Sequence, residues 1–157
     1  MIKAIIFDYD GVISESVDIK TKAFAELYKP YGEDVVNKVV KHHLHNGGIS
    51  RFEKFKIYHK EFLGIELTSQ DLLILTDRFS QMVVDEVVKS PFVKGAIEFV
   101  SSNYKKYDLF ISTGTPQTEI IEILRKNNIL QYFIEVYGSP TLKPEHIRII
   151  LSKFNYL

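Results

Sequence analysis

The feature that most constrains the fold is a short apolar run, Ala4–Phe7, which ends abruptly at two acidic residues and a glycine. An apolar run without polar alternation is typical of a parallel strand that is buried on both faces. Two more strands are predicted at Tyr107–Ser112 and Tyr132–Tyr137, and each is followed by a helical pattern. Alternation of this kind predicts right-handed crossovers and a parallel sheet, and therefore an α/β fold of the Rossmann-like class.

A long helical block interrupts this alternation after the first strand. From about Asp18 to Lys89 the apolar residues recur at helical spacing, with a break at Gly47-Gly48. Within the block, Thr68 followed by Asp71 predicts a capping box at a helix start. We therefore expect residues 1–14 and 91–157 to form an α/β core and residues 15–90 to form a helical cap inserted into it.

The composition narrows the classes of function. The 20 basic and 20 acidic side chains cancel, so no overall charge favours nucleic acid or an anionic membrane. The chain has no cysteine, which excludes a disulfide framework and a thiolate-ligated zinc site. No apolar run approaches the roughly 20 residues of a membrane-spanning helix, and the N-terminal run is too short for a signal peptide. We expect a cytoplasmic protein that binds neither nucleic acid nor membrane.

The first candidate motif is Asp8-Tyr9-Asp10-Gly11, at the C-terminal end of the first predicted strand. Open α/β sheets bind their ligands at this end of the strands. Two carboxylates at this spacing can face one pocket, and Gly11 allows a sharp turn after them. A plain polar turn is the alternative, because Asp-Gly pairs are common in turns. An EF-hand calcium loop is excluded, since its further oxygen ligands and its twelfth-position glutamate are absent.

Two further candidate motifs lie in the second half of the chain. The segment Ile111–Pro116 places hydroxyl groups and a glycine between a strand and a helix, with Thr115 as the expected N-cap and Pro116 as the first helical residue. Backbone N–H groups at such a helix start attract anions, although the same pattern also suits a simple helix cap. Lys143-Pro144 places a cation at the positive end of a helix dipole, which suggests an anion such as a phosphate nearby.

The order of these motifs resembles that of the haloacid dehalogenase (HAD) phosphohydrolases. The shared order is a strand with Asp-x-Asp-Gly, a helical insertion, a strand with Thr-Gly, and then Lys-Pro. Ser139-Pro140 with Lys143-Pro144 resembles the third motif of the subgroup whose helical cap lies between motifs one and two. The resemblance covers essentially the whole chain. It implies a HAD-like core with a helical cap, and an enzyme that hydrolyses phosphoric monoesters.

The resemblance also implies roles for four residues. Asp8 would be the nucleophile and a Mg²⁺ ligand, and Asp10 would be the general acid and base, with its backbone carbonyl also on the metal. Thr113 would hydrogen-bond the transferring phosphoryl group, and Lys143 would neutralise its charge. Attack by Asp8 would give an aspartyl-phosphate, with Mg²⁺ and Lys143 screening the two approaching negative charges. The haloalkanoate dehalogenases of the superfamily lack the second aspartate, so Asp10 favours phosphate over halide.

The candidate substrate-binding residues are Gly11, Gly114 and Arg51. The segment Gly47–Arg51 resembles the specificity loop of helical caps, whose arginine binds a distal phosphate in the sugar-phosphate mutases of the superfamily. Arg51 could therefore bind a second anionic group through two hydrogen bonds from its planar guanidinium. The alternative is an exposed arginine that starts a helix.

Two clusters near this loop have simpler interpretations. His42, His43 and His45 lack a companion cysteine or carboxylate cluster, so we expect a solvated helix end rather than a metal site. The aromatic residues from Phe52 to Phe62 are expected to form the cap core. We do not interpret them as a stacking platform for nucleic acid.

One family motif has no counterpart in the sequence. HAD enzymes carry a fourth, acidic motif beyond the lysine that completes the Mg²⁺ shell, whereas Glu145 is the sole acid after Lys143 here. The strands that would flank the first strand on its other side are absent too, so Ala4–Phe7 is expected at the edge of the sheet. We therefore expect a truncated chain with impaired Mg²⁺ binding and turnover.

The sequence thus predicts a magnesium-dependent phosphatase that acts on a small phosphorylated metabolite, of the phosphoglycolate or sugar-phosphate type. One alternative is a phosphomutase of sugar phosphates, which uses the same four residues and returns the phosphoryl group to its substrate. The other is a catalytically impaired protein that only binds a phosphorylated metabolite.

Overall fold

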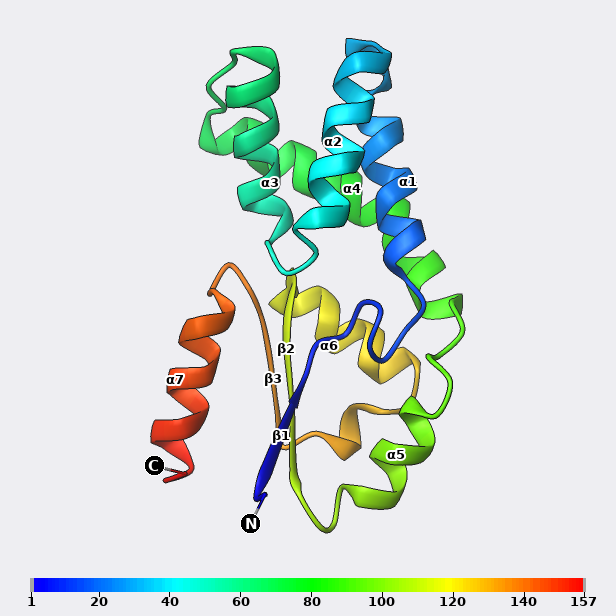
Figure 1. Ribbon diagram of the computed structural model, residues 1–157, viewed down its shortest axis with the longest axis vertical. Coiled ribbons are helices and arrows are strands. Elements are labelled where there is room, and N and C mark those ends of the chain that lie inside the picture. The colour runs from blue at the N-terminus through cyan, green and yellow to red at the C-terminus, as the bar shows by residue number, and fades with distance from the viewer. Residues whose placement is uncertain (1, 157) are drawn as a thin grey trace.

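The computed structural model describes residues 2–156 and has an α/β fold (Figure 1). Three strands, β1 (Ala4–Phe7), β2 (Asp108–Pro116) and β3 (Glu135–Ser139), form a parallel sheet in the order β1-β2-β3. Helices α5 (Ala96–Asn103) and α6 (Gln117–Lys126) lie on one side of the sheet, and α7 (Lys143–Lys153) lies on the other (Figure 1). These layers confirm the predicted α/β class.

Residues 17–89, between β1 and α5, form a helical bundle beyond the C-terminal ends of the strands (Figure 1). It consists of α1 (Val17–Tyr28), α2 (Glu33–His45), α3 (Arg51–Ile57) and α4 (Ser69–Lys89), with short helical turns at Lys29–Tyr31 and Tyr58–Leu63. The predicted capping box is confirmed, because Thr68 and Asp71 each accept a hydrogen bond from the backbone of the other. None of the described helices has the length and apolar character needed to cross a membrane.

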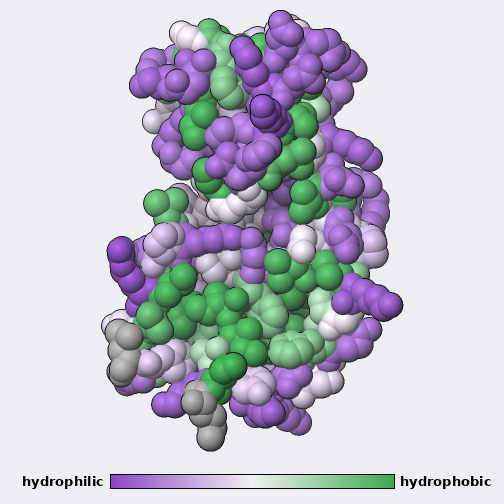
Figure 2. Space-filling model, in the orientation of Figure 1, coloured by the Kyte–Doolittle hydropathy of each residue, from purple (hydrophilic) through white to green (hydrophobic). Residues whose placement is uncertain are grey.

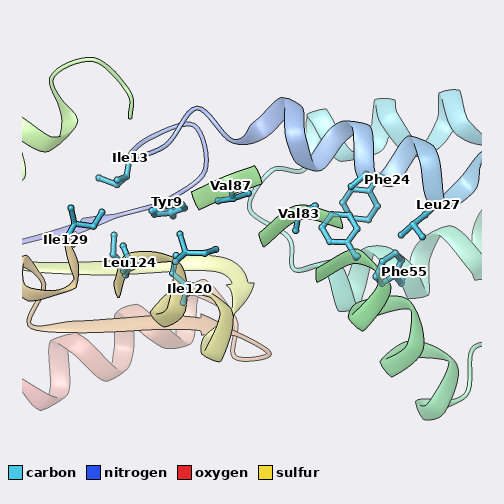
Figure 3. Close-up of a cluster of buried hydrophobic side chains, with 14 of the residues drawn as sticks. Tyr9, Ile13, Phe24, Leu27, Phe55, Val83, Val87, Ile120, Leu124 and Ile129 are labelled. Carbon is cyan, nitrogen blue, oxygen red and sulfur yellow. The ribbon is translucent and has the colours of Figure 1, made fainter. Parts of the chain in front are cut away.

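The buried apolar side chains form one cluster that runs from the sheet into the bundle (Figure 3). Ile120 lies at the sheet end of the cluster, and Phe24 and Phe55 lie between the helices of the bundle. Val83 and Val87 of α4 are fully buried between these two groups. Because α4 contributes to both, burial of apolar surface holds the bundle against the sheet.

β1 lies at the edge of the sheet, as the sequence predicts. Among the described strands it pairs only with β2, from Ala4 with Asp108 to Phe7 with Ile111. All four of its residues are only partly buried, and hydrophobic surface is prominent on this side of the sheet-containing half (Figure 2). The composition of β1 thus suits a central strand better than the edge position that it occupies.

The boundary between β2 and α6 differs from the prediction. The strand continues through Thr115 to Pro116, and the helix begins only at Gln117 without a side-chain cap. Pairing of Pro116 with Ser139 extends the strand. The two segments can approach because residue 138 is glycine: a Cβ there would lie 2.6 Å from the Thr115 carbonyl oxygen. The prediction of Thr115 as an N-cap is therefore wrong, and its hydroxyl is available to the site described below.

The third strand also begins later than predicted. Leu130–Tyr132 forms a 3-10 turn, in which the Phe133 N–H donates to the Leu130 carbonyl. β3 therefore starts at Glu135 rather than at Tyr132. The short turn satisfies backbone groups that an extended strand would have to pair with β2.

Candidate active site

Asp8 and Asp10 lie at the C-terminal end of β1, where the chain turns sharply. Between them the Tyr9 side chain is fully buried, and its carbonyl oxygen accepts from three successive N–H groups, those of residues 12 to 14. Gly11 adopts a positive φ of 75°, a conformation that favours glycine. The turn directs both carboxylates to one cavity, which Asp8 and Asp10 line together. Gly11 itself is not one of the lining residues, so its predicted contact with substrate stays a prediction.

Each carboxylate oxygen of Asp8 has a partner within the protein. Its Oδ1 accepts the Tyr9 N–H at 2.8 Å, and its Oδ2 forms an ion pair with the Lys143 ammonium at 2.5 Å. Lys143 is the first residue of α7, where its charge is unfavourable for the helix dipole. The Asp8 carboxylate lies beside this charge, so the two predicted residues converge although 135 positions separate them, while a phosphate near Lys143 stays a prediction.

Asp10 is the centre of a second polar cluster. Lys20 of α1 donates to Asp10 Oδ2 at 2.5 Å and to the Thr115 hydroxyl at 2.7 Å, while the Ser16 hydroxyl donates to Asp10 Oδ1 at 2.7 Å. Burial would raise the pKa of Asp10, but the Lys20 charge and the hydrogen bonds from Lys20, Ser16 and Thr115 together hold it below its ordinary value of 3.8. Asp10 is therefore ionised at neutral pH.

Thr113 lies beside this cluster. It is buried, its Oγ1 accepts the Thr115 N–H at 3.2 Å, and its hydroxyl donates to Thr115 Oγ1 at 3.4 Å. Within residues 2–156, neither Thr113 nor Lys143 is among the cavity-lining side chains, whereas Gly114 and Thr115 are. The predicted phosphoryl contact of Thr113 stays a prediction.

The cavity has a volume of about 180 Å³ and lies between the sheet end and the helical bundle. The loop that the sequence predicts as a specificity loop covers it. A Cβ on Gly114 would lie 3.3 Å from the Ile49 carbonyl oxygen, and a Cβ on Gly48 would lie 3.6 Å from the Lys143 ammonium. The bundle is thus closed over the strand ends, and a side chain at position 114 would be in tight contact with the loop.

Arg51 connects the bundle to the core. Its guanidinium forms two hydrogen bonds with the Glu119 carboxylate of α6, at 2.5 and 2.9 Å, and a third with the Ser80 hydroxyl at 2.8 Å. Arg51 is only 5% exposed, so the alternative of an exposed arginine is wrong. Arg51 lines the cavity, but its donors are directed at Glu119 in this structure, and binding of a second anionic group by Arg51 stays a prediction.

Three cationic or titratable side chains of the cavity were missed by the sequence analysis: Lys20, His43 and Lys54. His43 is 6% exposed, so the expectation of a solvated helix end is wrong for this residue, although His45 is exposed. The helical spacing of the sequence could have predicted that the two lysines are buried. Lys20 precedes Phe24 by four residues and Lys54 precedes Tyr58 by four, so each lysine lies on a buried helix face.

Replacing Lys20 with methionine is expected to raise the pKa of Asp10. In the intact protein the pKa of Asp10 is lower in the folded state than in the unfolded state. Ionised Asp10 therefore stabilises the fold fully at a pH above the unfolded-state pKa. This stabilisation is lost as the pH falls through the folded-state pKa. Without Lys20, only the hydroxyl groups oppose the effect of burial. A ¹³C titration of the carboxyl carbon measures the change. An unchanged pKa for Asp10 in Lys20→Met would show that Lys20 does not control its ionisation.

The acidic residues at the turn suit a Mg²⁺ ion. Mg²⁺ uses one or two protein carboxylates and completes its shell with water and substrate phosphate. Asp8 and Asp10 both line the cavity, and the predicted use of the Asp8 carboxylate and the Asp10 backbone carbonyl as ligands stays a prediction. Among residues 2–156 no cluster of three or more histidine, aspartate or glutamate residues could hold a metal ion by itself.

Comparison with known proteins decides the family. Residues 5–155 match the haloacid dehalogenase-like hydrolases. The chain belongs to this family. This confirms the resemblance inferred from the order of the motifs and the prediction of a hydrolase.

Individual members of the family are also similar to this hydrolase. A "phosphorylated carbohydrates phosphatase" from Thermotoga maritima is 31% identical over 98% of this chain and 71% of its own length. A solved β-phosphoglucomutase from Clostridium difficile has a TM-score of 0.77 at 21% identity, covering 99% of this chain and 72% of its own. A haloacid dehalogenase-like hydrolase from Streptococcus pneumoniae has a TM-score of 0.68 at 19% identity, covering 98% and 70%. The two solved structures support the same fold.

Proposed function

We propose that this hydrolase is a magnesium-dependent phosphatase that cleaves a small phosphorylated metabolite through an aspartyl-phosphate on Asp8. The observation that carries the proposal is the convergence of Asp8 and Asp10 on one cavity, each in an ion pair with a lysine, Lys143 or Lys20. The relative from Thermotoga maritima, whose name gives phosphorylated carbohydrates as its substrates, supports a phosphate ester as substrate.

In the proposed first step, the Asp8 carboxylate attacks phosphorus and the ester oxygen leaves. Lys143 lies 2.5 Å from the nucleophile, so its charge reduces the repulsion between the carboxylate and the phosphate. Mg²⁺ held by the Asp8 carboxylate and the Asp10 carbonyl would withdraw further charge from the phosphoryl oxygens. The leaving oxygen needs a proton, which Asp10 must first take up because Lys20 holds it ionised.

In the proposed second step, water attacks the phosphorus of the aspartyl-phosphate and releases inorganic phosphate. Asp10 accepts the proton of this water, a role that suits an ionised carboxylate directly. Lys20 and Thr115 position the accepting oxygen, because both donate to Asp10 Oδ2. One side chain thus serves as acid and then as base.

A phosphomutase is the alternative from the sequence analysis, and the position of Arg51 argues against it. In the mutases that the sequence resembles, the corresponding arginine binds a distal phosphate, whereas here Arg51 is bound to the buried Glu119 carboxylate. A guanidinium neutralised in this way has little attraction left for a second phosphate.

The test compares phosphate release with isomer interconversion. With Mg²⁺ present, we expect release of inorganic phosphate from p-nitrophenyl phosphate and from sugar phosphates, and loss of release when EDTA is added. Interconversion of sugar-phosphate isomers without release would support the mutase instead. Binding of phosphate esters without any turnover would support a protein that only binds them.

A further inference from the structure

The charged side chains around the cavity form ion pairs, with one exception among the described residues. The pairs are Asp8–Lys143, Asp10–Lys20 and Arg51–Glu119. The exception is Lys54 of α3, which lines the same cavity, is only 2% exposed and forms no ion pair with any residue from 2 to 156. A buried ammonium without a counter-charge is costly, so this position calls for an explanation.

The hydrogen-bond partner of Lys54 is an uncharged histidine. The Lys54 ammonium lies 2.8 Å from His43 Nδ1, and because an ammonium can only donate, Nδ1 must accept and the ring proton lies on Nε2. Burial, followed by the charge of Lys54, lowers the pKa of His43 to about 4, so the ring is neutral at pH 7. Burial lowers the pKa of Lys54 to about 8, which leaves it mostly protonated at that pH.

The one donor of the His43 ring has no partner among the described residues. Its Nε2 is buried and makes no hydrogen bond within the described chain, although most buried polar groups in proteins are paired. The ring packs on Phe24, with the two ring centroids 4.9 Å apart. His43 and Lys54 both line the cavity from the bundle helices α2 and α3, and their side chains are in contact there.

The sheet side and the bundle side of the cavity offer different chemistry, and each suits a different group of one substrate. Asp8 and Asp10 at the sheet end take the phosphoryl group, while His43 and Lys54 come from α2 and α3 of the bundle. A small anion with two oxygens would supply both the counter-charge that Lys54 lacks and the acceptor that His43 lacks. A carboxylate meets both needs with a single negative charge, which matches the single unpaired ammonium.

We propose that Lys54 and His43 form a carboxylate-binding subsite, so that the preferred substrate is a phosphorylated carboxylic acid. The proposal rests on the proposed phosphatase function and narrows its substrate class. It assigns specificity to the bundle residues His43 and Lys54 rather than to Arg51, whose charge is already neutralised by Glu119.

The test uses phosphonates, which the enzyme cannot hydrolyse at their carbon–phosphorus bond. Phosphonoacetate, 3-phosphonopropionate and 4-phosphonobutyrate are each compared by calorimetry with the counterpart that ends in a hydroxyl group, in the presence of Mg²⁺. At least one acid is expected to bind roughly 10- to 100-fold more tightly than its neutral counterpart, as for a hydrogen-bonded charge pair. Lys54→Met should remove most of this preference. Lys56→Met, an exposed lysine of the same helix, should keep it.

Equal binding of every acid and its counterpart by the intact protein would overturn the subsite, as would a preference that persists in Lys54→Met. Unfolding in urea checks that the variant is folded, and Lys54→Gln replaces it if it is not. Turnover of p-nitrophenyl phosphate is measured in parallel. Turnover without acid preference would overturn the subsite alone, whereas acid preference without turnover would overturn the phosphatase alone.

Discussion

Replacing Asp8 with asparagine is expected to lower the rate of phosphate release by at least about 1,000-fold, because removal of a covalent nucleophile leaves only binding and electrostatic contributions. The amide keeps the size of the side chain, and its oxygen can still accept the Tyr9 N–H. It cannot form the aspartyl-phosphate, and it carries no charge for Lys143 to pair with. Steady-state release of inorganic phosphate at saturating substrate measures the effect.

The fold is expected to tolerate this change, because the Asp8 side chain is 30% exposed. Asp77→Asn on the exposed face of α4 is the matched control and should retain full activity. Urea unfolding of both variants separates a loss of chemistry from a loss of structure. If Asp8→Asn retains a tenth or more of the activity, Asp8 is not the nucleophile, and the proposed mechanism is wrong.

The convergence of Asp8 and Lys143 could be predicted from the sequence for a physical reason. Parallel strands end at the same edge of a sheet, so residues that follow different strands meet there even when they lie far apart along the chain. Apolar runs locate the strands, and the acidic turn and the Lys-Pro pair mark their ends. The strands therefore indicate that both residues lie at the same edge of the sheet, and the resemblance to the family indicated that they share one site.

The role of Thr115 shows where local patterns fail. A threonine before a proline is a good start for a helix, but pairing of β2 with β3 carries the strand to Pro116. The hydroxyl then joins Lys20 and Asp10 instead of capping α6. Tertiary pairing overrode the local preference, and no signal within the segment itself indicates this outcome.

The partner of Arg51 could not be predicted at all. Glu119 lies on α6, and the pair forms only because the bundle closes onto the strand ends. The chain has 20 acidic residues, and nothing in the local sequence distinguishes Glu119 from the exposed Glu122 of the same helix. The partner is decided by how the bundle lies on the core, which a one-dimensional pattern does not contain.

Breaking this pair is expected to have the largest effect on stability. Arg51→Met or Glu119→Met alone should lower the free energy of unfolding by about 3–5 kcal/mol, because each leaves an unpaired charge in a buried position. Urea unfolding followed by circular dichroism measures the loss. Glu122→Gln is the matched control: its exposed pair with Lys126 lies on the same helix, and its removal should cost less than about 1 kcal/mol.

The double variant Arg51→Met/Glu119→Met distinguishes a coupled pair from two independent residues. With both charges replaced by apolar side chains, the loss of stability should be smaller than in either single variant. Because Arg51 belongs to the bundle and Glu119 to the sheet domain, this coupling exists only while the bundle is closed over the cavity. Additive losses would instead mean that the two residues do not meet in solution, and that the closed arrangement in which Lys54 and Asp10 line one cavity is not the resting state of the protein.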